Sequence, residues 1–418
     1  MFGSDISSES RMFLHPEATE EIEGIRRPVG IQNSDHSLKS ESENFCYHFP
    51  IHIFAYQEFA VSMDDRQLDD LRNPPAERLA INACTGVTAE RILCRTVGRG
   101  QTAAFLAESL PSSSVTCHFI DIYPAEDARD LTTNFPNLNI VCSPDLPEGE
   151  VDLFVMPVAR GGEAELTREI LQQGYDRLAI GGMLIATSDN KKDVWLHHEI
   201  DKFGRNIDRT PKRHGVTYRM KKLKPLKRLR DFTAEFVFRD GENLVQAVSR
   251  PGVFSHRRLD VGARALMEVM TINPGDHVLD IGCGSGTVAL AAGLRAPDVH
   301  VHAIDSNSRA VQCAIAGAHL NGLANFTTGM TADGELFDDE RDLSGTFDVA
   351  LANPPYFSHF QIAEIFLQSA RKGLKPGGRL YFVTKHAEWA TARIEQLFDD
   401  VEVQDVRGYD VISAKQRA

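Results

Sequence analysis

The sequence has no long apolar run. No stretch approaches the roughly 20 consecutive apolar residues that a membrane-spanning helix requires. Its first 24 residues are polar and acidic, whereas a secretory signal is basic and then apolar. We therefore expect a protein that neither spans a membrane nor is exported.

Cysteine is sparse and its spacing is irregular. Seven cysteines are scattered over 418 residues, and none forms a Cys-x-x-Cys pair. This pattern disfavours a disulfide framework and a structural zinc site, and we predict no metal site. It favours a reducing, cytoplasmic compartment.

Basic residues are outnumbered: 45 Lys and Arg stand against 59 Asp and Glu, for a formal net charge of −14. The composition, 42% hydrophobic and 25% charged, is that of a soluble globular protein, and the length suggests two to three domains. The first 44 residues hold eight serines and nine acidic residues with little apolar periodicity. We predict a disordered acidic tail over residues 1–48.

The rest of the chain alternates β-rich runs with helical stretches, which is typical of a parallel sheet covered by helices. Four sequence blocks occur twice, in the same order, at offsets between 184 and 196 residues. The paired blocks begin at Arg91 and His277, Val115 and Val299, Val151 and Phe347, and Leu178 and Leu374. We predict an α/β fold of two tandem Rossmann-like domains, at residues 49–208 and 232–418.

Positive charge gathers between the two predicted domains. Residues 209–230 contain ten basic residues and no acidic one, so we predict a basic linker over residues 209–231. Such a segment can neutralise nucleic-acid phosphates, although a solvated connector is the alternative. The predicted nucleic-acid-binding residues are Arg219, Lys221, Lys222, Lys224, Lys227, Arg228 and Arg230. A hairpin is predicted to follow, turning at Asp240-Gly241.

The second copy contains a glycine-rich turn between a buried strand and a helix. The strand ends near Asp280, and Gly282, Gly284 and Gly286 follow. Glycines let a backbone approach a ligand closely, and open α/β sheets bind ligands at the carboxyl ends of their strands. The next strand ends in Asp305, whose carboxylate can accept hydrogen bonds from ribose hydroxyls. These features predict a nucleoside-containing ligand without identifying it.

A second motif in this copy is Asn353-Pro354-Pro355-Tyr356, which ends an apolar strand. The prolines lock the backbone, so that the Asn353 amide oxygen and the Pro354 carbonyl form two converging acceptors. Two such acceptors fit an amino group, and Tyr356 offers a ring face for a planar substrate. The alternative is a strand-terminating turn with a buried tyrosine.

Together these motifs resemble the class I S-adenosylmethionine-dependent methyltransferases, and most of all the two-lobed ribosomal RNA guanine-N2 methyltransferases. The resemblance covers residues 232–418 and rests on Pro251 to Ser255, Leu259 to Gly262, Asp280 to Gly286, Asp305, Asn353 to Tyr356, and Pro376 to Gly378. It implies S-adenosylmethionine as cofactor.

In the resemblance, Asp280 and the three glycines hold the methionine end of the cofactor, Asp305 holds the ribose, and residues 353–356 hold the target amine. Two positions depart from the family. Met330 stands where a polar residue usually faces the adenine, with Asp333 as a possible substitute, and Phe357 stands where histidine is common.

The first copy lacks these groups. Cys94 and Thr96 align with Asp280 and Gly282, and residues 157–160 (Pro-Val-Ala-Arg) align with residues 353–356. Asp121 alone remains, at the ribose position. We predict that the N-terminal domain is a degenerate methyltransferase-like scaffold.

The expected function is methylation of an exocyclic amine, guanine N2 of ribosomal RNA, by a cytoplasmic monomer that acts on ribosomal RNA or a ribosomal subunit without a metal. Four alternatives stay open. They are methylation of a protein glutamine amide or adenine N6, methylation of adenine or cytosine in DNA, a non-catalytic RNA-binding assembly factor, and a nicotinamide oxidoreductase, in which the Asn-Pro-Pro-Tyr motif has no role.

Overall fold

The computed structural model describes residues 73–338, 341–355 and 360–418. All of them belong to one compact unit, Met63–Ala418. The predicted acidic tail, the beginning of the first predicted domain and Tyr356 lie outside the described residues. Within these ranges, no helix is both long enough and apolar enough to cross a membrane.

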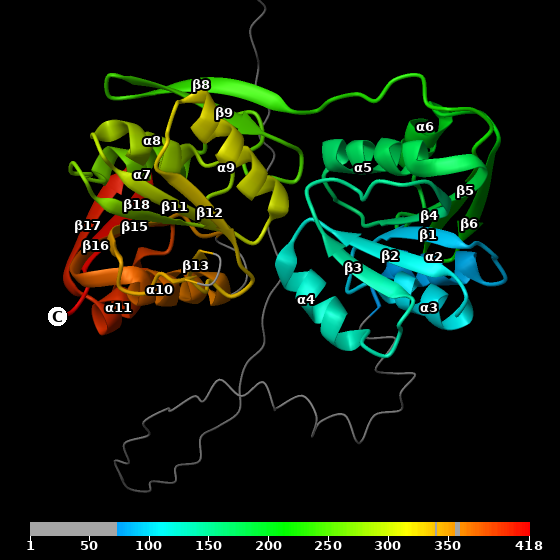
Figure 1. The fold of residues 1–418 in the computed structure, drawn as a ribbon, viewed down its shortest axis with the longest axis horizontal. Helices are drawn as coiled ribbons and strands as arrows, with labels where there is room; N and C mark the ends of the chain where they lie inside the picture. The colour runs from blue at the N-terminus through cyan, green and yellow to red at the C-terminus, as the bar shows by residue number, and fades with distance from the viewer. Residues whose placement is uncertain (1–72, 339–340, 356–359) are drawn as a thin grey trace, which may run out of the picture. The chain divides into compact units, whose positions relative to one another are not determined.

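The first copy forms a seven-stranded sheet flanked by helices (Figure 1). Its strands are β1 (Arg91–Arg95), β2 (Ser114–Phe119), β3 (Leu138–Cys142), β4 (Val151–Val158), β5 (Leu178–Ser188), β6 (Ile207–Lys212) and β7 (Gly215–Lys221). Its helices are α2 (Pro75–Cys84), α3 (Gln101–Ser109), α4 (Ile122–Leu131), α5 (Ala164–Arg177) and α6 (Trp195–Asp201).

The second copy forms another seven-stranded sheet. Its strands are β10 (His277–Ile281), β11 (His300–Asp305), β12 (Phe326–Met330), β15 (Phe347–Ala352), β16 (Leu374–Thr384), β17 (Asp399–Val406) and β18 (Tyr409–Lys415). Its helices are α7 (Val261–Val269), α8 (Thr287–Arg295), α9 (Ser308–Leu320), α10 (Gln361–Gly373) and α11 (Ala387–Leu397), and a short pair, β13 (Phe337–Asp338) and β14 (Arg341–Asp342), lies outside the sheet.

The two sheets have the same strand order. It is β3-β2-β1-β4-β5-β7-β6 in the first and β12-β11-β10-β15-β16-β18-β17 in the second. In each, the first five strands are parallel and the last two run antiparallel to their neighbours. The shared strand order confirms the tandem duplication predicted from the repeated blocks.

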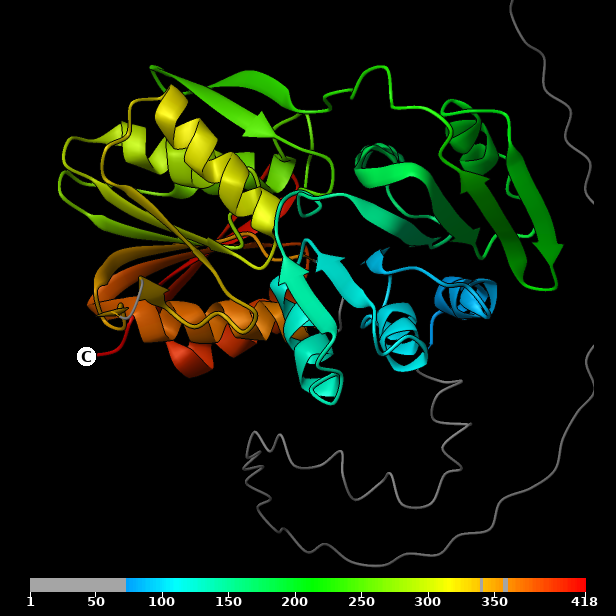
Figure 2. The ribbon, with the colours of Figure 1, turned by 45° about the vertical axis from the view of Figure 1, so that its right-hand side comes forward.

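Helices cover both faces of the second sheet, α7 to α9 on one side and α10 and α11 on the other (Figures 1 and 2). Alternate residues of β10 supply the two cores, because successive side chains of a strand point to opposite faces. Val278 packs in the α7–α9 core, while Leu279 packs in the α10–α11 core. The strand is therefore buried on both faces, as is typical of a strand inside a parallel sheet.

The predicted hairpin is confirmed as β8 (Ala234–Asp240) and β9 (Asn243–Ser249). Gly241 turns the chain with φ of 56°, in the left-handed region that glycine adopts without a Cβ clash. Asp240 is buried and forms a bidentate ion pair with Arg295 at 2.7 and 2.8 Å, so the turn is anchored to the end of α8.

The predicted basic linker over 209–231 is wrong for its first half. Residues 209–212 belong to β6 and residues 215–221 belong to β7, and these two strands complete the first sheet. The physical reason is alternation: Val216, Tyr218 and Met220 are buried, and Tyr218 donates to Asp193 at 2.7 Å. Arg219, which lies between two of them, and Lys221, which follows, hid this strand pattern in the sequence.

Candidate active site

The predicted site residues of the second copy meet at one edge of its sheet. β10 lies between β11 and β15, and all three strands are parallel. Ile281 pairs with Ile304 on one side and with Ala352 on the other. The residues that follow, Gly282, Asp305 and Asn353, therefore share the carboxyl edge, where such sheets bind ligands.

The three glycines of the turn have different roles. All have positive φ, 70° for Gly282, 53° for Gly284 and 76° for Gly286. A Cβ on Gly282 would lie 2.3 Å from the Phe366 ring, and one on Gly286 would lie 2.9 Å from the Ala314 Cβ. A Cβ on Gly284 would meet only the Phe254 carbonyl, at 4.0 Å. The turn is therefore packed at both ends and open at its centre.

Two carboxyl groups, from Asp280 and Asp305, border this turn. Asp280 is buried and accepts from the Ala289 N–H at 3.1 Å. Asp305 accepts from the Gly284 N–H at 2.8 Å and the Asn307 N–H at 2.9 Å, which fixes its side chain against the open centre.

Both carboxyl groups have raised pKa values. Burial raises the pKa of Asp280 from 3.8 to about 7, and the charge of Asp305 adds to the shift. Burial likewise raises the pKa of Asp305 to about 6, with Asp121 contributing. Within the described ranges neither forms a salt bridge. The edge thus suits a ligand that brings positive charge and hydroxyl donors.

Asn353 is held in a defined orientation by Asp260. Its Nδ2 donates to Asp260 Oδ2 at 3.0 Å, and the same oxygen accepts from the Ala263 N–H at 2.9 Å, where Asp260 caps α7. Because a carboxylate only accepts, it must face the NH2 of the amide, so the amide oxygen points elsewhere. Pro354 is buried and Pro355 half-buried after it.

Sequence reasoning gave Asp260 no role of its own. The helix-start signal was present, since an aspartate directly before the apolar α7 sequence is a common N-cap. Its contact with Asn353 spans 93 positions and becomes visible only when β15 and α7 are folded together.

Asp333 lies in the loop after β12 and is exposed. Its Oδ1 accepts from the Thr331 hydroxyl at 3.2 Å and from the Glu335 N–H at 3.1 Å. Met330 ends β12 and is 42% exposed. Asp333 is therefore at the carboxyl edge, with one oxygen already used to shape its own loop.

The turn of the first copy is filled by a side chain of the protein. Glu77 of α2 is fully buried, and its carboxylate accepts from Val97 N–H at 3.0 Å, from Thr102 N–H at 3.2 Å, and from the hydroxyls of Thr96 and Thr102. These donors belong to the turn and the start of α3, where the second copy has its open centre. Glu77 was not foreseen from the sequence, and it gives a physical reason for the degeneracy of this copy.

Asp121, the one acid that the first copy keeps, also has structural partners. It caps α4 by accepting from Tyr123 N–H at 3.1 Å and accepts from the Ser306 hydroxyl at 3.0 Å. Backbone hydrogen bonds join the same two loops, from Ile122 N–H to Ser306 and from Ser308 N–H to Ile120. Asp121 therefore supports the loop that follows Asp305.

The predicted nucleic-acid-binding residues separate into two groups. Lys222 is buried, its Nζ donates to the carbonyls of Asp176 at 2.9 Å and Leu178 at 2.6 Å, and burial lowers its pKa. Arg219 lies on β7 and donates to the Ala83 carbonyl. We correct the prediction by removing Lys222, which supports the sheet. The exposed members are Lys221, Lys224, Lys227, Arg228 and Arg230.

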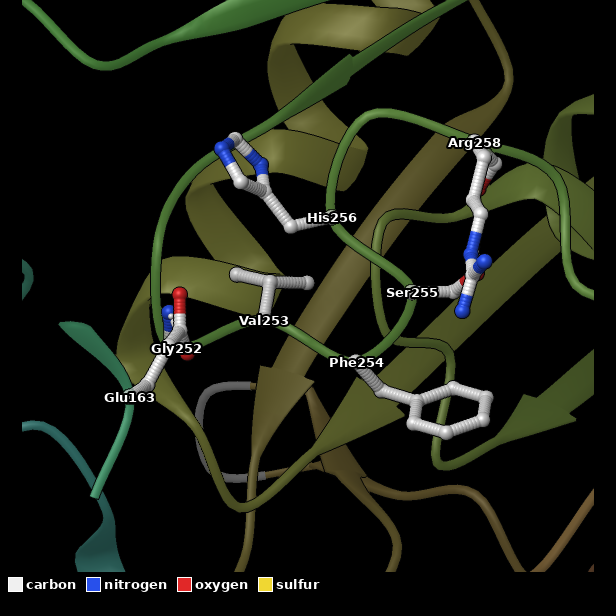
Figure 3. A pocket seen from close by; sticks show the side chains of 7 residues that line it. All are labelled: Glu163, Gly252, Val253, Phe254, Ser255, His256 and Arg258. Atoms are coloured by element: carbon white, nitrogen blue, oxygen red, sulfur yellow. Dashed lines mark hydrogen bonds between the residues drawn. The ribbon is translucent and has the colours of Figure 1, made fainter. Parts of the chain in front are cut away.

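A cavity of about 590 Å³ lies at the loop between β9 and α7 (Figure 3). Six of the seven lining residues belong to this loop, among them Phe254 and Arg258, and the seventh is Glu163, which accepts from the Gly252 N–H. No group of three or more His, Cys, Asp or Glu residues in the described ranges is arranged to hold a metal ion.

Comparison with known proteins places this fold and site in a family. Residues 245–413 match the model of the methyltransferase small domain. The chain is 29% identical over 314 residues to a ribosomal RNA small subunit methyltransferase C of Pseudoalteromonas translucida, covering 71% of this chain and 87% of that protein. It is 33% identical over 175 residues to the uncharacterized protein YbxB of Bacillus subtilis, covering 40% of this chain and 84% of that one.

Among solved structures, the fold resembles a T. thermophilus 16S rRNA N2 methyltransferase, determined with AdoMet and guanosine. The TM-score is 0.67 at 19% identity, over 82% of this chain and 92% of that one. Two sheets of the same order, an open glycine turn in the second and the small-domain match agree with one another. The chain therefore belongs to the class I S-adenosylmethionine-dependent methyltransferases.

Proposed function

We propose that the protein methylates N2 of a guanine in small-subunit ribosomal RNA. The observation that carries the proposal is the amide of Asn353, which Asp260 orients at the strand edge beside the open turn. Relatives named as small-subunit ribosomal RNA methyltransferases, and a structural neighbour named for N2 methylation, support this substrate.

The residues of the turn fit S-adenosylmethionine. The centre of the turn, at Gly284, has no Cβ to exclude a ligand, and Asp305 lies against it as an acceptor for ribose hydroxyls. Asp280 gives a buried carboxylate to balance a cationic ligand. When bound, the cofactor supplies a methyl group attached to a sulfonium centre, and that sulfonium centre is a good leaving group.

This chain contributes mainly orientation. The Asn353 amide oxygen and the Pro354 carbonyl accept the two protons of the target amine, which aims its nitrogen toward the methyl group. Such positioning can lower a barrier by roughly 7 to 11 kcal/mol. No strong base is needed, because the amine can lose its proton after transfer.

Cofactor affinity should depend on pH. The raised pKa values, about 7 for Asp280 and about 6 for Asp305, mean that the unliganded protein holds protons which a cationic, hydroxyl-bearing ligand displaces. Affinity should therefore increase from about pH 5.5 to about pH 8 and then level. In the unliganded protein the same shifts are destabilising, and their cost grows as pH rises from about 4 through 7.

Calorimetric titration with S-adenosylmethionine at several pH values measures this dependence. Asp280→Asn and Asp305→Asn should each flatten the profile. A wild-type affinity that does not change over this range would contradict the assignment of the two carboxyl groups.

The exposed basic residues of the segment 221–230 should contact RNA. Reversing the charge of Lys221, Lys224 and Lys227 should weaken binding to 16S rRNA and flatten its salt dependence, since each lost phosphate contact lowers the log–log slope by roughly 0.7 to 0.9. The control variant reverses the charges of Arg371 and Lys372, which are exposed at the end of α10. Filter binding at several salt concentrations measures both slopes. If the triple variant had the same salt slope as the wild-type protein, residues 221–230 would be a solvated connector and not an RNA contact.

Transfer of labelled methyl to separate substrates tests the proposed function. In vitro transcribed 16S rRNA, small subunits, large subunits, DNA and protein extract are each incubated with the protein and labelled cofactor. We expect label in 16S rRNA or in small subunits. Label confined to protein would favour glutamine methylation instead. Activity as a monomer and a cytoplasmic location remain predictions from the sequence.

A further inference from the structure

The loop of residues 251–258, which joins β9 to α7, connects the two halves of the site. Near the middle of the loop, the Phe254 carbonyl oxygen would lie 4.0 Å from a Cβ on Gly284, the open centre of the turn. At its C-terminal end, the loop leads to Asp260, which orients Asn353. A group bound on this loop would therefore lie beside both the cofactor turn and the predicted amine acceptors.

The loop is held in a strained shape. Ser255 and Arg257 have φ of 57° and 71°, two of the six non-glycine residues with positive φ in the described ranges. Its anchors are hydrogen bonds from Gly252 N–H to Glu163 at 2.8 Å and from Arg257 N–H to the Ser249 hydroxyl at 2.9 Å. Strained residues persist only where their surroundings fix them, and they concentrate at functional sites.

Two side chains of this loop, Phe254 and Arg258, are exposed. Phe254 is 64% exposed, the largest exposed fraction among the exposed large apolar residues of the described part of the chain. Arg258 is exposed, and its guanidinium forms no hydrogen bond or ion pair within the described residues, whereas Arg257 pairs with Glu165 at 3.1 Å. Figure 3 shows Phe254 and Arg258 projecting toward the same side of the loop.

An exposed ring beside an exposed guanidinium suits single-stranded RNA. Bases stack on aromatic rings, and arginine pairs with phosphates. The adjoining cavity of about 590 Å³ is within the usual range for ligand pockets. Enzymes that modify a base move it out of the base stack. The neighbouring bases of the strand then lose a stacking partner.

We propose that Phe254 stacks on a base of the RNA strand next to the target nucleotide and that Arg258 pairs with a phosphate of that strand. The inference rests on the proposed function and adds to it a substrate-positioning surface distinct from the basic segment. It assigns neither residue to the cofactor.

Variants of Phe254 test the stacking. Phe254→Ala should raise the KM for 16S rRNA about ten-fold or more, the usual effect of removing one stacked base partner. Phe254→Tyr and Phe254→Trp should restore most of the loss, because they keep the ring. Calorimetric titration should give an unchanged affinity for S-adenosylmethionine in all three.

Variants of Arg258 test the phosphate contact. Arg258→Ala should weaken RNA binding and lower its salt slope by about 0.7, the value for one contact to a single strand. Arg371→Ala is the control, because Arg371 is also exposed and lies at the end of α10, away from the carboxyl edge. The Arg371→Ala variant should bind RNA with the wild-type affinity and the wild-type salt slope.

The outcomes separate this inference from the proposed function. A wild-type protein that methylates RNA, together with Phe254→Ala and Arg258→Ala variants that match it in KM and salt slope, would overturn the inference alone. Loss of cofactor affinity in Phe254→Ala would also overturn it, since the ring would then belong to the cofactor site. A wild-type protein with no activity on any RNA would overturn both.

Discussion

Asn353→Ala should lower kcat by about 100- to 1,000-fold, the usual effect of deleting one preorganised hydrogen-bonding group that acts in the transition state. The amide oxygen of Asn353 is proposed to accept from the target amine, and its NH2 donates to Asp260. Cofactor affinity should therefore stay within about two-fold of wild type. Single-turnover methyl transfer and calorimetric titration measure the two quantities.

Asp260→Asn supplies the matched comparison. Asparagine is as good a helix N-cap as aspartate, so α7 should keep its start. Its amide can present either an oxygen or an NH2 to Asn353, so the orientation of Asn353 is no longer fixed by charge. We expect a smaller loss of kcat than in Asn353→Ala, again with normal cofactor affinity. An Asn353→Ala variant as active as the wild-type protein would contradict the proposed mechanism.

Arg309→Met should lower the free energy of unfolding by about 3 to 5 kcal/mol, because it leaves a buried acid without one of its partners. Arg309 on α9 is fully buried, and its Nη1 donates to Glu169 of α5 at 2.6 Å and to the Pro251 carbonyl at 2.8 Å. Glu169 and Asp145 also pair with Arg250, so two arginines and two acids form one network.

Arg407→Met is the control for this prediction. Arg407 pairs with Glu268 at 2.7 Å, and its side chain is 52% exposed. An exposed ion pair contributes about 1 kcal/mol or less, so the control should unfold almost as wild type does. Urea denaturation of the three proteins measures the difference. Equal stability losses in the two variants would show that the buried network does not hold α9 to α5.

The sequence predicted those parts of the fold that local patterns determine. The repeated blocks predicted two sheets of one topology, and Asp240-Gly241 predicted a hairpin, because both depend on apolar periodicity and turn chemistry. The placement of Asp280, Asp305 and Asn353 near one edge also followed, since each lies at or beside the carboxyl end of a strand in a sheet expected to be parallel.

Contacts between distant positions could not be predicted in the same way. Glu77 reads as an ordinary acid in a first helical turn, yet it fills the turn of the first copy. Lys222 reads as one of ten basic residues, yet its ammonium is buried against two carbonyls. In both cases the charge suggests exposure, and only the folded packing supplies the partners that make burial possible.

Identification of the methylated nucleoside tests the central proposal most directly. In vitro transcribed 16S rRNA, free or in reconstituted small subunits, is incubated with the protein and S-adenosylmethionine carrying a deuterated methyl group. It is then digested to nucleosides and analysed by mass spectrometry. We expect deuterated N2-methylguanosine with wild-type protein and its near absence with Asn353→Ala. Deuterium in N6-methyladenosine, or in no nucleoside while protein is labelled, would contradict guanine N2 as the target.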